Sequence, residues 1–241
     1  RFDEGDSSRL PFLGIGQPNT QGGDVRPGYF WIGSGKDKQE IGEAVSVVIE
    51  KLTATRMARP PYGEQENKPY CFSADRTTGQ IRDPLWVNGV NTPVRTQPCS
   101  SCPHFLDKPW EVDVGCFKEL AAFVWIPSLE ELAQLNIRGA SFIPFRDSGP
   151  GRLILPQVIA GKTRLPKRPI YYALLMLSTE KHEEVRGKYW TLAVQEETVF
   201  DEKAAAEYRQ MAIDLSAVTV QAEDSDDAGV PEEATSDTLF S

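Results

Sequence analysis

Short apolar runs alternate with turn-forming residues along this chain, which is the pattern of a mainly β protein. The runs are rich in β-branched and aromatic residues, and they predict strands at Gly28–Gly33, Ala44–Leu52, Leu120–Ile126, Leu153–Ile159, Ile170–Ser178 and Tyr189–Gln195. The almost wholly apolar run Ile170–Ser178 indicates a central strand. Such short strands fit a small barrel or a barrel-like sheet. A parallel α/β fold would need helices between the strands, and most of these are missing.

Two segments have helical patterns. Ser128 and Glu131 have the spacing of a capping box, which predicts a short helix through Leu135. The segment from Asp201 to about Ala217 predicts one long C-terminal helix, with Asp201 as its N-cap. An apolar stripe at helical spacing supports this prediction and consists of Ala205, Tyr208, Met211, Ala212 and Leu215.

Composition divides the chain into three parts. Residues 1–27 are rich in Gly, Asp, Gln and Pro, and they predict a flexible arm or an irregular lead-in. Residues 28–220 predict a single β-rich domain, in which residues 55–118 are rich in Pro, Gly, Asn, Thr and Cys and predict a loop-rich insertion. A compact domain tolerates such a long irregular segment only when something holds it in place. Residues 221–241 hold seven acidic residues and no Lys or Arg, and they predict a disordered acidic tail.

The net charge of −9 comes mostly from that tail. The first 220 residues hold 26 basic and 28 acidic side chains, and the segment Arg138–Lys188 holds ten basic and four acidic ones. We therefore expect a nearly neutral body with one basic region. No apolar run approaches the roughly 18–20 residues that span a bilayer, and no leader pattern is visible, so we expect a cytoplasmic protein without a membrane partner.

The four cysteines lie in the loop-rich insertion at Cys71, Cys99, Cys102 and Cys116. A C-x2-C pair on a tight turn supplies two ligands at the separation that Zn²⁺ prefers, and the two outer cysteines complete a tetrahedral set. His104 is a possible substitute for one thiolate. Four protein ligands leave no position for water or substrate, so this zinc, or iron in its place, would be structural.

Three other readings of the cysteines remain open. They are a structural disulfide pair, a redox C-x-x-C and buried cysteines without a ligand. Nothing in the sequence points to secretion, which argues against disulfides. Pro98 and Pro103 flank the C-x-x-C, whereas a thioredoxin-like motif needs a strand before it and a helix after it.

The basic region has the chemistry of a surface that binds single strands, because basic side chains contact phosphates and aromatic rings stack on bases. The cluster Lys162–Arg168 has four positive charges in seven residues and no acid, and we interpret it as a phosphate-contacting loop. The candidate nucleic-acid-binding residues are Arg138, Arg146, Lys162, Arg164, Lys167, Arg168, Tyr171, Lys188 and Trp190. The alternative is that Tyr171 and Trp190 are core residues and that the charges are solvated.

The acidic tail offers two functions besides solubility. It can compete with phosphates for the basic region of the same chain. It can also present Leu239 and Phe240 to a partner with a basic-rimmed pocket.

Several of these residues together resemble a known group of proteins. The run Tyr70–Asp75 around Cys71, the Cys99-x2-Cys102-Pro103 motif, the later Cys116 and the strand-rich C-terminal half resemble zinc-containing single-stranded DNA-binding proteins of phages and prophages. The acidic tail is similar to those that recruit replication and repair enzymes, although Ser241 follows Phe240 here and no Pro-Phe pair ends the chain. The resemblance implies an OB-type barrel with a zinc-stabilised insertion, sequence-tolerant DNA binding, four cysteine ligands and a bacterial or infected host cell.

No catalytic motif is convincing, so we expect a protein that is not an enzyme. The two histidines, His104 and His182, accompany no nucleophile motif, and Gly33–Lys36 lacks the spacing of a phosphate-binding loop. The main hypothesis is a single-stranded DNA-binding protein of replication or recombination. The alternative is a zinc-stabilised interaction or assembly subunit of a larger complex, such as a transcription machine. A weaker third reading is a zinc-ribbon regulator that recognises duplex DNA.

Overall fold

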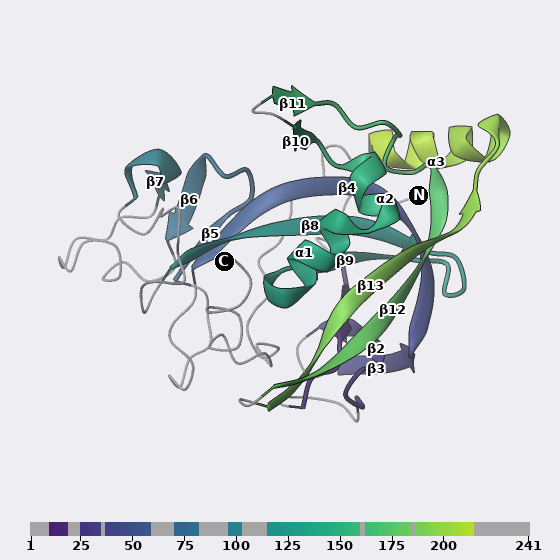
Figure 1. The fold of residues 1–241 in the computed structure, drawn as a ribbon, viewed down its shortest axis with the longest axis horizontal. Helices are drawn as coiled ribbons and strands as arrows, with labels where there is room; N and C mark the ends of the chain where they lie inside the picture. Colours follow the sequence, from purple (N-terminus) through teal and green to yellow (C-terminus); the bar gives the residue numbers. More distant parts are fainter. Residues whose placement is uncertain are drawn as a thin grey trace, which may run out of the picture.

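The computed structural model describes residues 10–18, 25–34, 37–58, 70–81, 96–102, 115–159, 162–184 and 187–214 (Figure 1). The strands are β1 (Phe12–Ile15), β2 (Phe30–Ser34), β3 (Asp37–Gly42), β4 (Ala44–Ala58), β5 (Cys71–Ser73), β6 (Thr78–Ile81), β7 (Thr96–Pro98), β8 (Cys116–Ile126), β9 (Glu131–Ile137), β10 (Gln157–Ile159), β11 (Lys162–Arg164), β12 (Ala173–Glu184) and β13 (Gly187–Val199). The helices are η1 (Cys99–Ser101), η3 (Gly139–Ser141), α1 (Phe142–Asp147), α2 (Gly149–Ile154) and α3 (Glu202–Asp214). The prediction of a mainly β protein with few helices is confirmed.

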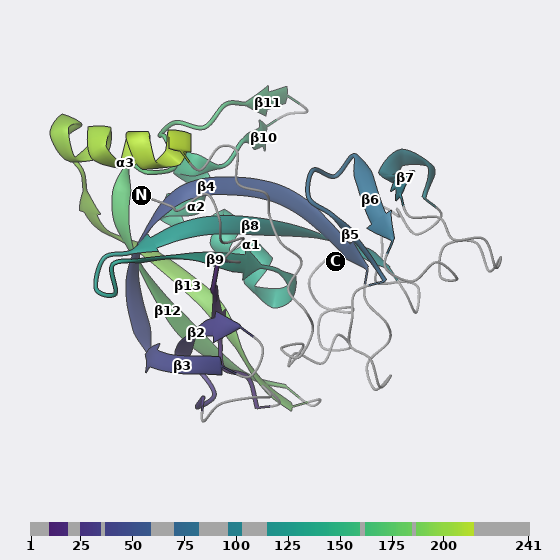
Figure 2. The same ribbon diagram turned by 180° about the vertical axis from the view of Figure 1, so that it is seen from behind.

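One large sheet dominates the molecule. Its strands follow the order β3-β2-β1-β9-β8-β4-β5-β6-β7, and the β12–β13 hairpin joins it through β4. All the pairings are antiparallel except that of β1 with β9. The long, curved β4 is the common element, because its first part pairs with β12, its remainder with β8 and its end also with β5 (Figures 1 and 2).

The main strands are connected as a Greek key. β4, β8 and β9 are antiparallel neighbours in the sheet, and β5, β6 and β7 are inserted between β4 and β8 along the chain. The chain then makes a long connection through α1, α2, β10 and β11 before β12 returns to pair with β4. Three consecutive neighbours and a fourth strand that returns to the first define this motif.

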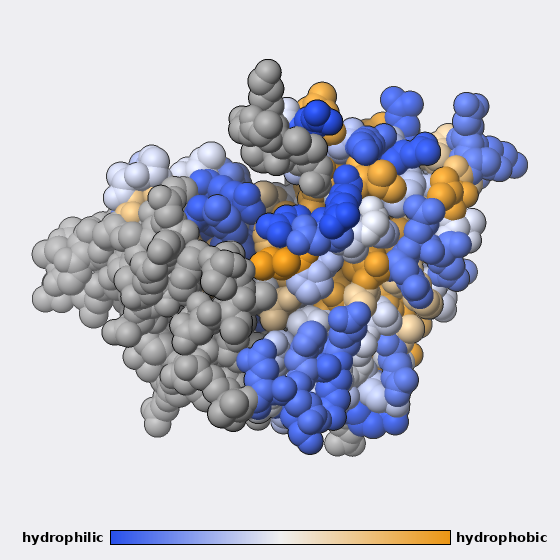
Figure 3. Space-filling model, viewed as in Figure 1, coloured by the Kyte–Doolittle hydropathy of each residue, from blue (hydrophilic) through white to orange (hydrophobic). Residues whose placement is uncertain are grey.

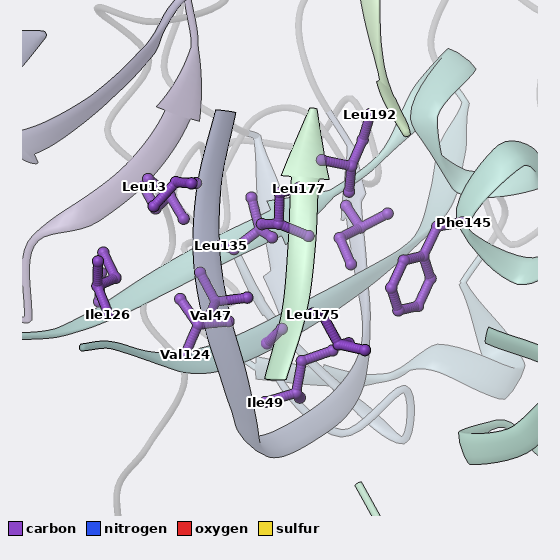
Figure 4. Packing of buried hydrophobic residues seen from close by; sticks show 14 of the residues in the cluster. Leu13, Val47, Ile49, Val124, Ile126, Leu135, Phe145, Leu175, Leu177 and Leu192 are labelled. Atoms are coloured by element: carbon purple, nitrogen blue, oxygen red, sulfur yellow. The ribbon is translucent and has the colours of Figure 1, made fainter. Parts of the chain in front are cut away.

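The hydrophobic core lies on the inner face of this curved sheet. Side chains from strands β1, β4, β8, β9, β12 and β13 and from α1 point toward one another in Figure 4, which labels Leu13, Val47, Ile49, Val124, Ile126, Leu135, Phe145, Leu175, Leu177 and Leu192. A second, smaller cluster of Met57, Phe72, Ala121, Phe123 and Leu132 lies on the outer face, where Met211 of α3 packs against it. The sheet is therefore buried on both faces near β4 and β8.

The backbone ladder does not close the sheet into a barrel within the described residues, but a side chain bridges two of its strands. The amide of Gln17, which follows β1, donates to the Trp190 carbonyl of β13 (2.9 Å) and accepts from the Trp190 N–H (3.0 Å). A neighbouring β-strand would form the same two hydrogen bonds with the Trp190 backbone. The Trp190 indole lies so close to Gly28 that a Cβ there would stand 2.4 Å from the ring nitrogen.

The capping-box helix predicted from Ser128 to Leu135 is wrong, because this segment is a turn followed by β9. Leu132 packs on the outer face, whereas Ala133 and Leu135 pack in the core. A strand with apolar residues on both faces has no clean alternation, so its pattern is easily mistaken for helical spacing. Pairing with β8 and β1 decides the outcome.

Three boundaries also differ from those predicted. Phe12–Ile15, which we expected in a flexible arm, form β1, while residues 1–9 and 19–24 lie outside the described residues. The strand predicted at 153–159 is divided between the end of α2 and β10. The insertion, predicted from residue 55 to 118, begins after β4 ends at Ala58 and ends where β8 starts at Cys116.

The C-terminal helix is confirmed as α3. The Asp201 carboxylate accepts a hydrogen bond from the Ala204 N–H (2.9 Å), as expected of an N-cap. Leu215 and the acidic tail with Leu239 and Phe240 lie outside the described residues.

Candidate metal centre and nucleic-acid interface

The end of β4 positions two of the four cysteines. Ala58, its last residue, pairs with Cys71 of β5 on one side and with Cys116 of β8 on the other. Residues that are directly paired across strands point to the same face of a sheet. The two cysteine side chains therefore stand on either side of the small Ala58 methyl group, which leaves space between them.

A glycine makes room for the third thiol. Cβ added to Gly79 of β6 would stand 2.7 Å from the Cys71 sulfur and 3.9 Å from the Cys99 sulfur. Gly79 pairs with Gln97 of β7, and Cys99 follows two residues later, so its side chain reaches the same face. The two sulfurs thus share the space that any larger residue at position 79 would occupy.

The tight turn of the C-x2-C motif brings in the fourth thiol. The Cys102 N–H donates to the Cys99 carbonyl (3.1 Å), which closes one turn of 3-10 helix. The Cys99 N–H donates to the Thr77 carbonyl (2.8 Å) and fixes this turn to the start of β6. Three separate segments therefore bring the four predicted ligands to one end of the sheet.

Each of two thiols has its ionisation influenced by other cysteines. Burial, reinforced by the three other cysteines, raises the pKa of Cys71 to about 12. Burial also raises the pKa of Cys116 to about 11, with smaller contributions from Cys99 and Cys102. All four cysteines are free thiols. Without a cation this site favours protonated sulfur, whereas a bound divalent metal would stabilise the thiolates.

The thiols are near one another without being closed into a coordination sphere. Within the described residues, no set of three or more His, Cys, Asp or Glu side chains already has the geometry that a metal ion requires. His104, the possible substitute ligand, lies outside those residues.

Two arginines lie near the end of β4 that carries the cysteines. Arg56 is buried in β4 and donates from Nη1 to the Cys116 carbonyl (3.3 Å), and its charge also opposes the rise in the Cys116 pKa. Arg76 donates to the carbonyls of Thr55 and Glu119, both at 3.2 Å. Burial and the nearby Arg56 lower the pKa of Arg76. Arg56 therefore favours negative charge on the Cys116 sulfur.

The turn between β5 and β6 is fixed by Asp75. Its carboxylate accepts hydrogen bonds from the backbone N–H groups of Thr77 (2.8 Å) and Thr78 (3.0 Å) and from the hydroxyl groups of Thr77 and Ser73. These bonds hold the pKa of Asp75 well below its usual value. An Asp that caps its own turn in this way sets the spacing between Cys71 and Gly79.

The predicted nucleic-acid-binding residues separate into distinct places. Arg164, Lys167 and Arg168 are exposed together on and after β11. Within the described residues no acidic partner is found for them, and the whole segment 157–170 contains no Asp or Glu. Lys162 belongs to the same strand, but its side chain lies outside the description. In Figure 3 a small hydrophilic (blue) group and a hydrophobic (orange) one lie side by side near the position of β11.

The other candidates are placed differently. Arg146 of α1 pairs with Asp147 (2.8 Å), and Lys188 pairs with Glu183 (3.5 Å) near the end of the β12–β13 hairpin, away from β11 in Figures 1 and 2. Arg138 and Tyr171 are half-buried. Trp190 is half-buried and packs against Gly28. This placement agrees with the alternative that Trp190 is a packing residue of the fold.

Two notable polar residues escaped the sequence analysis. Gln17 makes the bonds to β13, and nothing in its Gly-Gln-Pro context indicates this. Glu50 is only 1% exposed, and neither carboxylate oxygen has a hydrogen-bond partner among the described residues. It lies at a bulge in β4, and burial raises its pKa to about 8. A Glu inside the apolar run Ala44–Leu52 was the available signal.

Comparison of the chain with family models, with curated proteins and with solved structures finds no match. In the described part of the chain, none of the helices is long and apolar enough to cross a membrane.

Proposed function

We propose that this protein binds single-stranded DNA without strong sequence preference, supports replication or recombination, and uses a structural zinc ion to hold its insertion. The observation that carries the proposal is the acid-free, exposed surface of Arg164, Lys167 and Arg168 on a Greek-key β domain. Such a surface suits a phosphate backbone, whose charge is the main source of non-specific affinity.

The connectivity supports an OB-type barrel. An OB fold is a partly open, five-stranded Greek-key barrel, and its strands and loops bind oligonucleotides. Here β4, β8, β9, β12 and β13 supply five main strands with Greek-key connectivity. The bonds of Gln17 to Trp190 take the place of backbone pairing between β1 and β13. A barrel closed by side chains in this way is the arrangement that we propose.

The donor set supports zinc at Cys71, Cys99, Cys102 and Cys116. The four thiols come from three segments, two of them lie at a glycine that leaves no room for a side chain, and Arg56 supplies positive charge next to Cys116. A four-cysteine zinc site is closed and structural. It would join β5, η1 and β8, and so hold the insertion against the sheet.

The test replaces the positive charges of the surface. In the triple variant Arg164→Gln, Lys167→Gln and Arg168→Gln, we expect oligonucleotide affinity to fall at low salt and the slope of log affinity against log salt to become shallower by about two to three. The matched control is Lys181→Gln with Lys188→Gln, since both lysines pair with Glu183. Equal slopes for the triple variant and wild type would contradict the proposed surface.

A further inference from the structure

One apolar side chain stands out on the basic surface. Leu165 directly follows β11 and is 85% exposed, whereas the other exposed large hydrophobic residues in the described part of the chain lie between 38% and 53%. Its neighbours Arg164 and Pro166 are exposed as well. Single exposed leucines are common on protein surfaces, and what distinguishes Leu165 is its place between positively charged side chains.

The backbone holds Leu165 in a defined place. The N–H groups of Lys167 and Arg168 both donate to the Leu153 carbonyl at the end of α2, at 2.8 and 3.1 Å. On the other side, Arg164 pairs with Gln157 of β10. Pro166 fixes its own backbone angle and restricts Leu165 to extended conformations. The Leu165 side chain therefore projects from a segment whose backbone is held by hydrogen bonds on both sides.

The positive charges around Leu165 indicate which class of partner this segment would bind. Positive side chains stand before Leu165, at Arg164, and after it, at Lys167 and Arg168, and no acidic residue lies between 157 and 170. A partner that touches this segment must carry closely spaced negative charges and offer an apolar slot between them. A nucleic-acid strand does both, since its phosphates are charged and an apolar side chain can pack between its bases, as such side chains do between the base steps of duplex DNA.

We propose that Leu165 inserts between adjacent bases of a single DNA strand while Arg164, Lys167 and Arg168 hold the flanking phosphates. This inference rests on the proposed function and goes beyond it. It makes the segment after β11 an unstacking element, which separates neighbouring bases, in addition to a charged surface. Insertion adds affinity that does not depend on salt, because it releases no counterions.

The experiment uses the full-length protein and a single-stranded oligonucleotide that contains 2-aminopurine, a base whose fluorescence rises when it is unstacked. For Leu165→Ala we expect about tenfold weaker binding from the lost apolar contact, with the salt slope unchanged. At saturating protein, we expect the fluorescence to rise with wild type and to stay unchanged with Leu165→Ala. Leu165→Met keeps the apolar volume and should retain the rise. Leu129→Ala, at an exposed leucine in the β8–β9 turn, is the matched control and should behave as wild type.

The outcomes separate the two proposals. If wild type binds single strands and Leu165→Ala shows the same affinity and fluorescence rise, the insertion is overturned and the binding function stands. If wild type binds no oligonucleotide at low salt, the proposed function is contradicted, and so is the proposed insertion of Leu165. Weaker binding together with a lost rise, both restored in Leu165→Met, supports insertion.

Discussion

At the scale of single residues, the most informative position is Gly79, because its lack of a side chain is what lets two thiols approach each other. Its backbone lies in a regular strand, so the requirement for glycine is one of space. The same space is what a zinc ion bound between Cys71 and Cys99 would need.

We expect Gly79→Ala to weaken zinc binding at least tenfold, because the new methyl group would displace the Cys71 sulfur. Competition with a chromogenic chelator measures this affinity directly. Gly149→Ala is the control, since nothing lies within 4 Å of a Cβ at that position. Equal zinc affinity in the two variants would contradict the placement of the site.

Glu50 makes stability depend on pH. Its pKa is about 8 in the folded protein, against 4.5 for an unperturbed glutamate. Between these values the folded state keeps a proton that the unfolded state releases, so this contribution is complete below about pH 4.5 and is lost as the pH rises through 8. Because glutamine does not ionise, Glu50→Gln removes this contribution to the pH dependence of stability.

We therefore expect Glu50→Gln to be about as stable as wild type near pH 5 and more stable at pH 8, by roughly 1–3 kcal/mol in the free energy of unfolding. Denaturant titrations of both proteins across this range test it. The exposed Glu131→Gln is the control. A constant difference between wild type and Glu50→Gln at all pH values would show that Glu50 is ionised in the fold.

At the scale of elements, the apolar runs predict most strands well and the irregular ones poorly. The runs that became β4, β8, β12 and β13 are long and rich in β-branched or apolar residues. β9 was missed because its apolar residues serve two faces, and β3 was missed because its sequence, Asp-Lys-Gln-Glu-Ile-Gly, reads as a polar turn. Pairing with β2 makes β3 a strand, and no local pattern encodes that partner.

In the candidate site too, some features could be predicted from the sequence and others depend on the fold. Cysteine spacing predicted four residues as one ligand set, which stays a prediction, and β-strand registry places Cys71 and Cys116 on either side of Ala58. The basic cluster after β11 was visible as charge, but the pairing of Arg146 and Lys188 with acidic residues depends on the folded backbone. Gln17 gave no signal because its partner lies 173 residues away.

The contact between β1 and β13 gives a test at this scale. Gln17→Ala leaves the N–H and the carbonyl of Trp190 without their partner, and a buried unsatisfied polar group costs about 1–3 kcal/mol. We expect urea unfolding to show a loss of that order, with Gln195→Ala as an exposed control close to wild type. A loss below about 0.5 kcal/mol would mean that the bridge contributes little to the stability of the fold.

At the scale of the whole molecule, the proposed zinc ion joins an insertion to a sheet that has its own core. Cys99→Ser should release the metal and loosen β5, β6 and β7, because the metal supplies folding energy there. Hydrogen exchange should show faster exchange in those strands, while β12, β13 and α1, which pack in the main core, stay protected. Metal-free wild-type protein with normal thermal stability would contradict the zinc site.

The central claim is that this fold holds single-stranded DNA, and fluorescence anisotropy tests it most directly. Zinc-loaded protein is titrated into a mixed-sequence oligonucleotide, single-stranded and duplex, at low and at physiological salt. We predict tighter binding to the single strand, with affinity that falls linearly in log–log terms as salt rises. No binding to the single strand at low salt would contradict the claim and favour a protein-assembly role for the basic surface, and preference for the duplex would favour a duplex-binding regulator.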